Sequence, residues 1–103
     1  MRSTPANANC LVLSASVVQI HKLRYTPAGL PALNLALEHG SVVREADSER
    51  TISANIKAVV VGDLALILAQ QAVGTQAEFK GFLASTLRSK TPVFHIQSFQ
   101  LNH

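Results

Sequence analysis

The sequence predicts an all-β fold, a five-stranded barrel with one short helix between the third and fourth strands. Several stretches alternate apolar and polar residues, which is the period of a β-strand buried on one face. Only one stretch has helical spacing, and it lies between the third and fourth alternating stretches. Five antiparallel strands in an open sheet would leave unpaired edges, and closure into a barrel largely removes them.

Length and composition predict one globular domain. The chain has 103 residues, of which 48% are hydrophobic and 15% are charged. This composition supports a core and differs from that of a disordered chain. Residues 1–8 are polar and contain Pro5, so we expect a flexible N-terminal tail there. The domain is expected over residues 9–103.

The first two strands flank a loop with clear turn residues. Residues 10–18 alternate, and the odd-numbered set is the more uniformly apolar, so it is expected to face the core. Residues 21–31 contain Pro27 and Gly29, which favour a loop. Residues 33–38 then place leucine at every second position, a half-buried strand pattern.

The third strand and the helix follow a charged connection. Residues 39–49 are rich in charged side chains and are expected to form a solvated loop. The third strand is expected over residues 50–61. The period then becomes helical over residues 63–73, with Asp63 as the N-cap and Gly74 as the residue that ends the helix.

The last two strands complete the pattern. Residues 75–86 alternate, and Gly81 within them indicates a bulge or a bend. Residues 87–92 form a basic loop, and residues 93–101 form the fifth strand, whose apolar phase shift also indicates a bulge. Three strands, one helix and two strands is the order of the oligonucleotide/oligosaccharide-binding (OB) barrel.

Four segments carry a more specific resemblance. They read Asn-Cys-Leu-Val-Leu-Ser at 9–14, Thr-Pro-Ala-Gly-Leu-Pro at 26–31, Leu-Ala-Leu-Glu-His at 35–39 and Phe-Lys-Gly-Phe at 79–82. In this order and spacing, residues 9–101 resemble the primosomal replication protein N (PriB) family, which is related to bacterial single-stranded DNA-binding protein. The resemblance implies a homodimeric OB fold without catalytic activity.

The resemblance also implies a function. A PriB-like protein is an accessory protein of the replication restart primosome that binds single-stranded DNA, stimulates the PriA helicase and contacts the loader protein DnaT. The family's DNA face has aromatic residues near the start of the third strand, whereas residues 47–53 have none here, which predicts weak DNA binding. The alternative is a protein-interaction adaptor with weak or incidental DNA binding. An RNA-binding OB domain is a more remote alternative.

The candidate binding residues are cations and one ring. Proteins that bind single strands combine cations that neutralise phosphates with rings that stack on bases. Loops that flank the binding face, and outward positions on the third and fourth strands, supply such groups in an OB barrel. The predicted single-stranded DNA-binding residues are Lys22, Arg24, Tyr25, Lys57, Lys80, Arg88 and Lys90. For Phe82, packing in the core or at a dimer interface is the favoured interpretation.

Two further expectations concern the dimer and the charged connection. The family dimerises around the first strand, so its outer positions Val12, Ser14 and Ser16 are expected at the interface. In the charged connection, Arg44 and Arg50 alternate with acidic residues, which favours local ion pairing or plain solvation over DNA contact.

Other classes of protein lack support. The net charge of +3 permits a polyanionic partner without selecting one. Four histidines and the lone Cys10 have no metal-ligand spacing, so no metal or cofactor is expected. No nucleophile motif or glycine-rich phosphate loop is present, which argues against an enzyme. The lone cysteine, and the absence of an apolar stretch long enough for a bilayer, predict a cytoplasmic location without a membrane.

Overall fold

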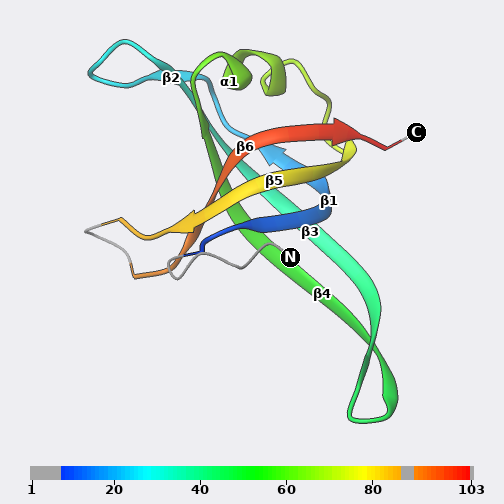
Figure 1. Cartoon of the computed structure of the whole chain (residues 1–103). Coiled ribbons are helices and arrows are strands. Elements are labelled where there is room, and N and C mark those ends of the chain that lie inside the picture. The colour runs from blue at the N-terminus through cyan, green and yellow to red at the C-terminus, as the bar shows by residue number, and fades with distance from the viewer. Residues whose placement is uncertain (1–7, 87–89, 103) are drawn as a thin grey trace, which may run out of the picture.

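The computed structural model describes residues 8–86 and 90–102 (Figure 1). Its strands are β1 (Leu11–Ile20), β2 (Arg24–Tyr25), β3 (Pro31–Glu45), β4 (Ser48–Val61), β5 (Gln76–Ala84) and β6 (Val93–Leu101), and the helix α1 (Asp63–Leu68) lies between β4 and β5. The predicted all-β fold with a short helix after the third long strand is confirmed. Of the tail expected over residues 1–8, only Ala8 lies within the described residues.

The five long strands form a closed ring. The sheet order is β1-β5-β6-β4-β3, and β1 also pairs with β3, which closes the ring. The pairs are antiparallel except for β4 and β6, which meet in parallel over a short register containing Val59 and His95. The two-residue strand β2 is an addition to the edge of β3, inside the loop expected over residues 21–31. The predicted OB topology is therefore confirmed.

The core lies inside this ring. Leu33, Leu35 and Leu37 alternate inward from β3 and are almost completely buried. Phe79 of β5 and Phe94 of β6 are fully buried beside them. Leucine favours helices, but packing against neighbouring strands outweighs intrinsic propensity in a sheet. Helix α1 adds two buried side chains to the same core, Ala65 and Leu68.

The prediction of a loop over residues 39–49 is wrong, because β3 and β4 continue there as a paired hairpin. The strands stay in register as far as Glu45 and Ser48, and this arm projects from the barrel in Figure 1. Its turn consists of Ala46 and Asp47, with φ angles of 51° and 64°. Positive φ at both central residues is the pattern of a type I′ turn, which matches the twist of a hairpin.

Helix α1 is shorter than the expected helix over residues 63–73, since it ends at Leu68. Gly62, with φ of 103°, is the N-cap, so Asp63 is the first helical residue and makes no side-chain cap hydrogen bond. Gly74 does not end the helix. Its N–H donates to the carbonyl of Val17 at 2.7 Å and directs the chain toward β5.

The sequence predicted one bulge at Gly81 and another in residues 93–101, but the structure has a single bulge between β5 and β6. The register between β5 and β6 shifts between Lys80 and Gly81, so that Lys80 faces Ser98 and Gly81 faces Ile96. Gln97 is the extra residue on β6. This shift determines which side chains of the two strands become neighbours on the outer face.

Candidate nucleic-acid interface

A groove lies on the outer face of the barrel where β1, β3 and β4 run side by side. Gln19, Ala36 and Lys57 are register partners across these strands, and Ala36 and Lys57 belong to the outward set. The chain between β1 and β2 borders the groove, which has a volume of about 520 Å³. We call it the cationic groove; its lining includes Gln19, Lys22, Arg24, Asn34, Ala36 and Lys57.

Arg24 is held over the sheet by Asn34. Its Nε donates to Oδ1 of Asn34 at 3.0 Å. The backbone of Asn34 is itself fixed, because its carbonyl accepts from the N–H of His21 at 3.0 Å. The guanidinium is thereby oriented while its remaining N–H groups stay available to an anion. Sequence analysis missed Asn34, because a neutral amide on a strand carries no binding signal of its own.

The side chains that give the cationic groove its charge are positive. Lys22 and Arg24 reach it from the chain around β2, and Lys57 reaches it from β4. No carboxylate is found among its described lining residues. Cations arranged along a groove suit a phosphate backbone, which they position without reading its sequence.

The remaining predicted site residues lie elsewhere. Tyr25 is 64% exposed and follows Arg24 directly, so strand alternation turns it away from the groove, which it does not line. Lys80 lies on the outer face of β5 in a separate shallow hollow with Ser98. Lys90 belongs to the connection before β6, where its carbonyl accepts from the hydroxyl of Ser85 at 3.2 Å. Arg88 lies outside the described residues.

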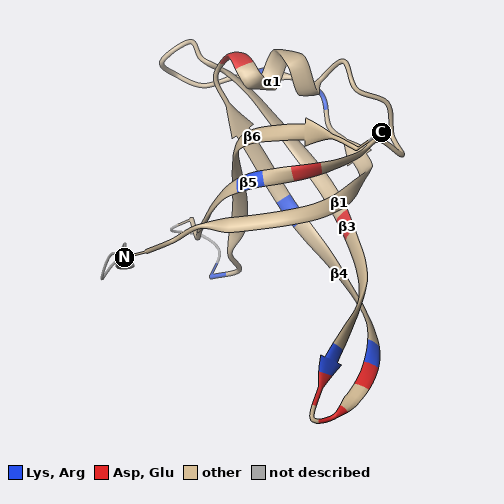
Figure 2. Ribbon diagram, turned by 45° about the vertical axis from the view of Figure 1, so that its right-hand side comes forward, with Lys and Arg blue, Asp and Glu red and all other residues tan. Residues whose placement is uncertain are grey.

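Cations are distributed over β4, β5 and the hairpin arm rather than on one strand (Figure 2). At the tip of the arm they alternate with carboxylates. Arg50 forms an ion pair with Glu45. Arg44 donates to the carbonyl of Asp47 at 3.5 Å, which is a weak contact. The predicted local ion pairing is therefore confirmed for Arg50, whereas Arg44 makes only this weak contact.

Phe82 is not part of the core. The buried core and the side chains packed against it exclude Phe82, which is half-buried on the outer face of β5. Its ring stacks on that of His95 of β6, with centroids 4.8 Å apart and planes 12° apart. Core packing, one of the two interpretations favoured for Phe82, is wrong, because alternation along β5 buries Phe79 and Gly81 and turns Phe82 outward.

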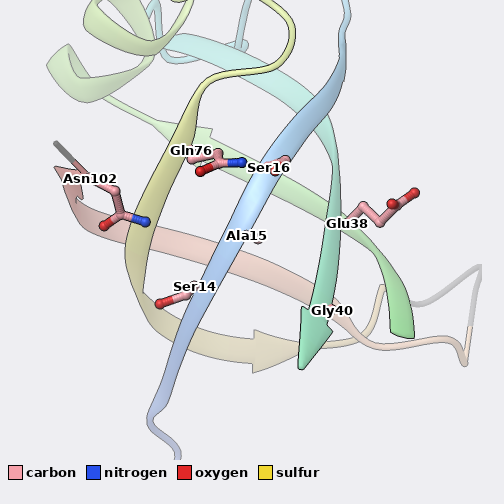
Figure 3. Close-up of a pocket in the computed structure, with 7 residues that line it drawn as sticks. All are labelled: Ser14, Ala15, Ser16, Glu38, Gly40, Gln76 and Asn102. Atoms are coloured by element: carbon pink, nitrogen blue, oxygen red, sulfur yellow. The ribbon is translucent and has the colours of Figure 1, made fainter. Parts of the chain in front are cut away.

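A second hollow lies on the outer face of β1. It has a volume of about 180 Å³ and is lined by polar groups from β1, β3, β5 and the C-terminal end (Figure 3). Ser14 and Ser16 line it together with Glu38. The carboxylate of Glu38 disfavours a phosphate here. This hollow is therefore a poor place for DNA, and it lies on the face expected to dimerise.

His39 connects β3 to β1 beside this hollow, and sequence analysis gave it no role. Its Nδ1 lies 2.6 Å from the carbonyl of Ser14, and its Nε2 lies 2.8 Å from Oγ of Ser41. A carbonyl can only accept, so Nδ1 is the donor toward Ser14. The step Glu38-His39 was visible in the sequence, but only the fold brings it to β1.

Clusters of metal ligands and helices that could span a membrane are both absent from the described part of the chain. No group of three or more His, Cys, Asp or Glu side chains there could hold a metal ion. None of the helical residues described forms a segment long and apolar enough to cross a membrane.

Comparison with known families points to single-strand binding. A family model described as "Another single-strand binding protein family" matches residues 9–98. The replication restart protein PriB of Bordetella pertussis is 47% identical over 90 residues, which cover 86% of this chain and 84% of that protein. PriB of Neisseria meningitidis serogroup B is 33% identical over 93 residues, covering 89% of this chain and 92% of that one.

Solved structures agree with this assignment. The structure of PriB from Ralstonia solanacearum matches with a TM-score of 0.85 and 35% identity, covering 93% of this chain and 99% of that one. A deletion mutant of the single-stranded DNA-binding protein from Thermus aquaticus matches with a TM-score of 0.75 at 18% identity, covering 93% of this chain and 51% of that one, which supports the fold alone. The chain belongs to the PriB family of replication restart proteins.

Proposed function

We propose that this protein binds single-stranded DNA in the cationic groove and, in replication restart, stimulates a PriA-type helicase by holding DNA near it. One observation carries the proposal. Lys22, Arg24 and Lys57, from two segments of the chain that are far apart in sequence, line one groove on an OB barrel, and none of its described lining residues is acidic. Relatives that are 47% and 33% identical are replication restart proteins, which supports the same role.

The expected binding is electrostatic and weak. Each lysine or arginine that neutralises a phosphate releases a condensed counterion, so affinity falls as salt rises. Stacking would add affinity, but residues 47–53, where the family has aromatic side chains, contain none. Lys57 and Arg24 would contact the phosphates of the DNA, so the binding is largely independent of the base sequence.

A salt titration tests the site. We would measure binding of a thymidine oligonucleotide by fluorescence anisotropy over a range of salt concentrations. Three phosphate contacts predict a slope of log K against log salt of about −2. Lys57→Gln should make that slope shallower by about 0.7. Lys80→Gln is the matched control, because Lys80 is also exposed on an outer strand face but lies in the other hollow. Equal effects of both variants would contradict binding in the groove.

The helicase step has its own readout. If DNA held in the groove is what stimulates the helicase, Lys57→Gln should reduce unwinding of a forked substrate in proportion to its loss of DNA affinity. Raising the protein concentration should then restore unwinding. Full stimulation by the variant, at concentrations where it no longer binds DNA, would separate the two activities and contradict the coupling.

A protein-interaction adaptor is the second candidate, supported by an apolar surface at one end of the barrel. Tyr25, Leu30, Val61 and Ile67 are each 47–64% exposed there. The N–H of Gly62 donates to the carbonyl of Pro31 at 2.8 Å, which ties the β2–β3 turn to the start of α1. Clustered exposed apolar side chains of this kind mark sites of protein contact. A PriA-type helicase or a DnaT-type loader is the partner we propose for it.

One substitution separates the two candidates. Ile67→Glu adds a charge to the apolar end without touching the cationic groove. If the adaptor role dominates, this variant loses helicase stimulation and keeps its oligonucleotide affinity. If the DNA-binding role dominates, Ile67→Glu behaves like the wild type in both assays, and Lys57→Gln loses oligonucleotide affinity and helicase stimulation together.

We also propose a homodimer formed through the outer face of β1. β1 pairs with β3 only from Ser16 to Ile20, so the preceding half of β1 has no ladder to β3 among the described residues. Val12 on that half is 51% exposed. A partly open strand edge with small side chains beside it can pair with the same edge of a second copy.

A further inference from the structure

Two rings stand side by side on the outer face of the barrel. Phe82 and His95 are register partners on β5 and β6. Their centroids are 4.8 Å apart and their planes differ by 12°. That separation equals the distance between neighbouring strands, about 4.7–4.9 Å, so each ring stands above its own strand and faces the other. Both side chains are half-buried, which leaves part of each ring open to solvent.

Local backbone structure creates this pair. The register shift between Lys80 and Gly81 moves the pairing of β5 with β6 by one residue, and this places Phe82 opposite His95. Gly81 allows the close approach, since a Cβ at that position would lie 1.8 Å from the carbonyl oxygen of His95. The rings are absent from the core cluster and from the side chains packed against it, so core packing does not account for them.

The ring pair lies in one row with the cationic groove. His95 is the register partner of Val59 on β4, and Val59 is the partner of Asn34 on β3. Register partners point to the same face of a sheet. His95 is therefore two strands, about 10 Å, from Asn34. Val59, which lies between the ring pair and the groove, is 8% exposed, so neighbouring side chains cover it almost completely.

We propose that Phe82 and His95 form a stacking platform for a base of the single strand whose phosphates contact the cationic groove. The inference rests on the proposed function and extends it from phosphates to bases. Aromatic rings next to a basic groove are the arrangement by which single-strand binders hold bases irrespective of sequence, because every base has a π face. The platform supplies rings in a chain whose residues 47–53 lack them.

The test separates base contacts from phosphate contacts. Two probes are used, a thymidine oligonucleotide and an abasic oligonucleotide of equal length, which keeps the phosphates and lacks the bases. Stacking predicts that the wild type prefers the thymidine probe. Phe82→Leu should lower that preference at least about fivefold, whereas Phe82→Tyr, which keeps a ring, should retain it. Leu83→Ala is the control, because Leu83 points to the opposite face of β5 and should leave the preference unchanged.

Each outcome decides between the two proposals. Lys57→Gln should weaken both probes equally, since it removes a phosphate contact only. If the wild type binds the two probes equally and Lys57→Gln weakens both, the platform is wrong while DNA binding in the groove stands. If Phe82→Leu leaves the preference intact, the base stacks elsewhere and the platform is also wrong. If the wild type binds neither probe, the proposed function fails together with the platform.

Discussion

Gly81 determines how closely β5 and β6 approach each other. The backbone of His95 occupies the space that a side chain at this position would need. Glycine elsewhere in the sheet has no such constraint: a Cβ at Gly40 would meet nothing closer than the carbonyl of Ile52 at 3.9 Å. The sequence indicated a bulge at Gly81, but not that the glycine sets the position of Phe82 relative to His95.

We predict that Gly81→Ala destabilises the barrel by at least about 1–3 kcal/mol, because the clash is with backbone rather than with a flexible side chain. Gly40→Ala is the matched control and should change stability by no more than about 0.5 kcal/mol. Urea denaturation followed by circular dichroism measures both. Equal midpoints for the two variants would show that β5 and β6 separate at low cost.

Some of the predicted site residues lie together in the cationic groove and others do not, and this separation has a physical reason. Lys22, Arg24 and Lys57 come together in the groove, whereas Lys80 lies in another hollow. Alternation along a strand shows that a side chain points outward, but in a closed ring the outward direction differs from strand to strand. The sequence therefore identified exposed cations and could not assign them to one face. Asn34 was missed because its role depends on a contact with Arg24 that only the fold creates.

At the scale of elements, the hairpin arm is the main departure from the sequence prediction. Charged residues over 39–49 indicated a loop, yet β3 and β4 remain paired there. Opposite charges across the strands explain this, since Arg44 faces Glu49 in the register and Arg50 pairs with Glu45. A sequence window sees the high charge but not the partner strand, so the pattern of a loop and that of a solvated hairpin look alike.

The turn of the arm yields a prediction. Ala46 and Asp47 both have positive φ, which is costly for residues other than glycine and asparagine. Replacing them by Asn and Gly, the preferred type I′ pair, should stabilise the hairpin by about 1 kcal/mol. Amide exchange of the arm should then slow about fivefold, as that free energy implies. Exchange at Leu33 and Leu35 in the barrel serves as the control and should not change. Unchanged amide exchange in the arm would show that the conformation of this turn does not limit the stability of the hairpin.

Helix α1 shows a similar limit of sequence patterns. Helical spacing extends over residues 63–73, but the helix ends at Leu68, once Ala65 and Leu68 have filled the end of the core. The next residues must bring the chain back to β5, and the hydrogen bond from Gly74 to Val17 fixes that path. Tertiary connection overrides helical propensity here.

At the scale of the molecule, the closed ring was predictable from the sequence, and the dimer expected at the first strand stays a prediction. Alternating strands with one intervening helix indicated a barrel, and strand pairing confirms it. β1 achieves closure by pairing with β5 through its first half and with β3 through its second half. The half that pairs only with β5 leaves room for a second copy of the chain, which no sequence pattern reveals directly.

We predict that the protein is a dimer in solution and that Val12→Asp makes it a monomer. A carboxylate placed on the outer face of β1 would be buried against its symmetry mate, at a cost that a weakly polar interface cannot offset. Light scattering after gel filtration measures the mass of each. Val42→Asp, at a position on the hairpin arm that is 63% exposed against 51% for Val12, is the control and should remain dimeric. A monomeric wild type, or a dimeric Val12→Asp variant, would exclude this interface.

The central claim is that the outer face around the cationic groove is where single-stranded DNA binds. Nuclear magnetic resonance of the isotope-labelled protein, titrated with a thymidine oligonucleotide, tests it directly. We predict that the largest backbone amide shifts fall at Arg24, Asn34 and Lys57, with smaller shifts at His95. Shifts concentrated on the hairpin arm, or in the hollow around Lys80, would contradict the account.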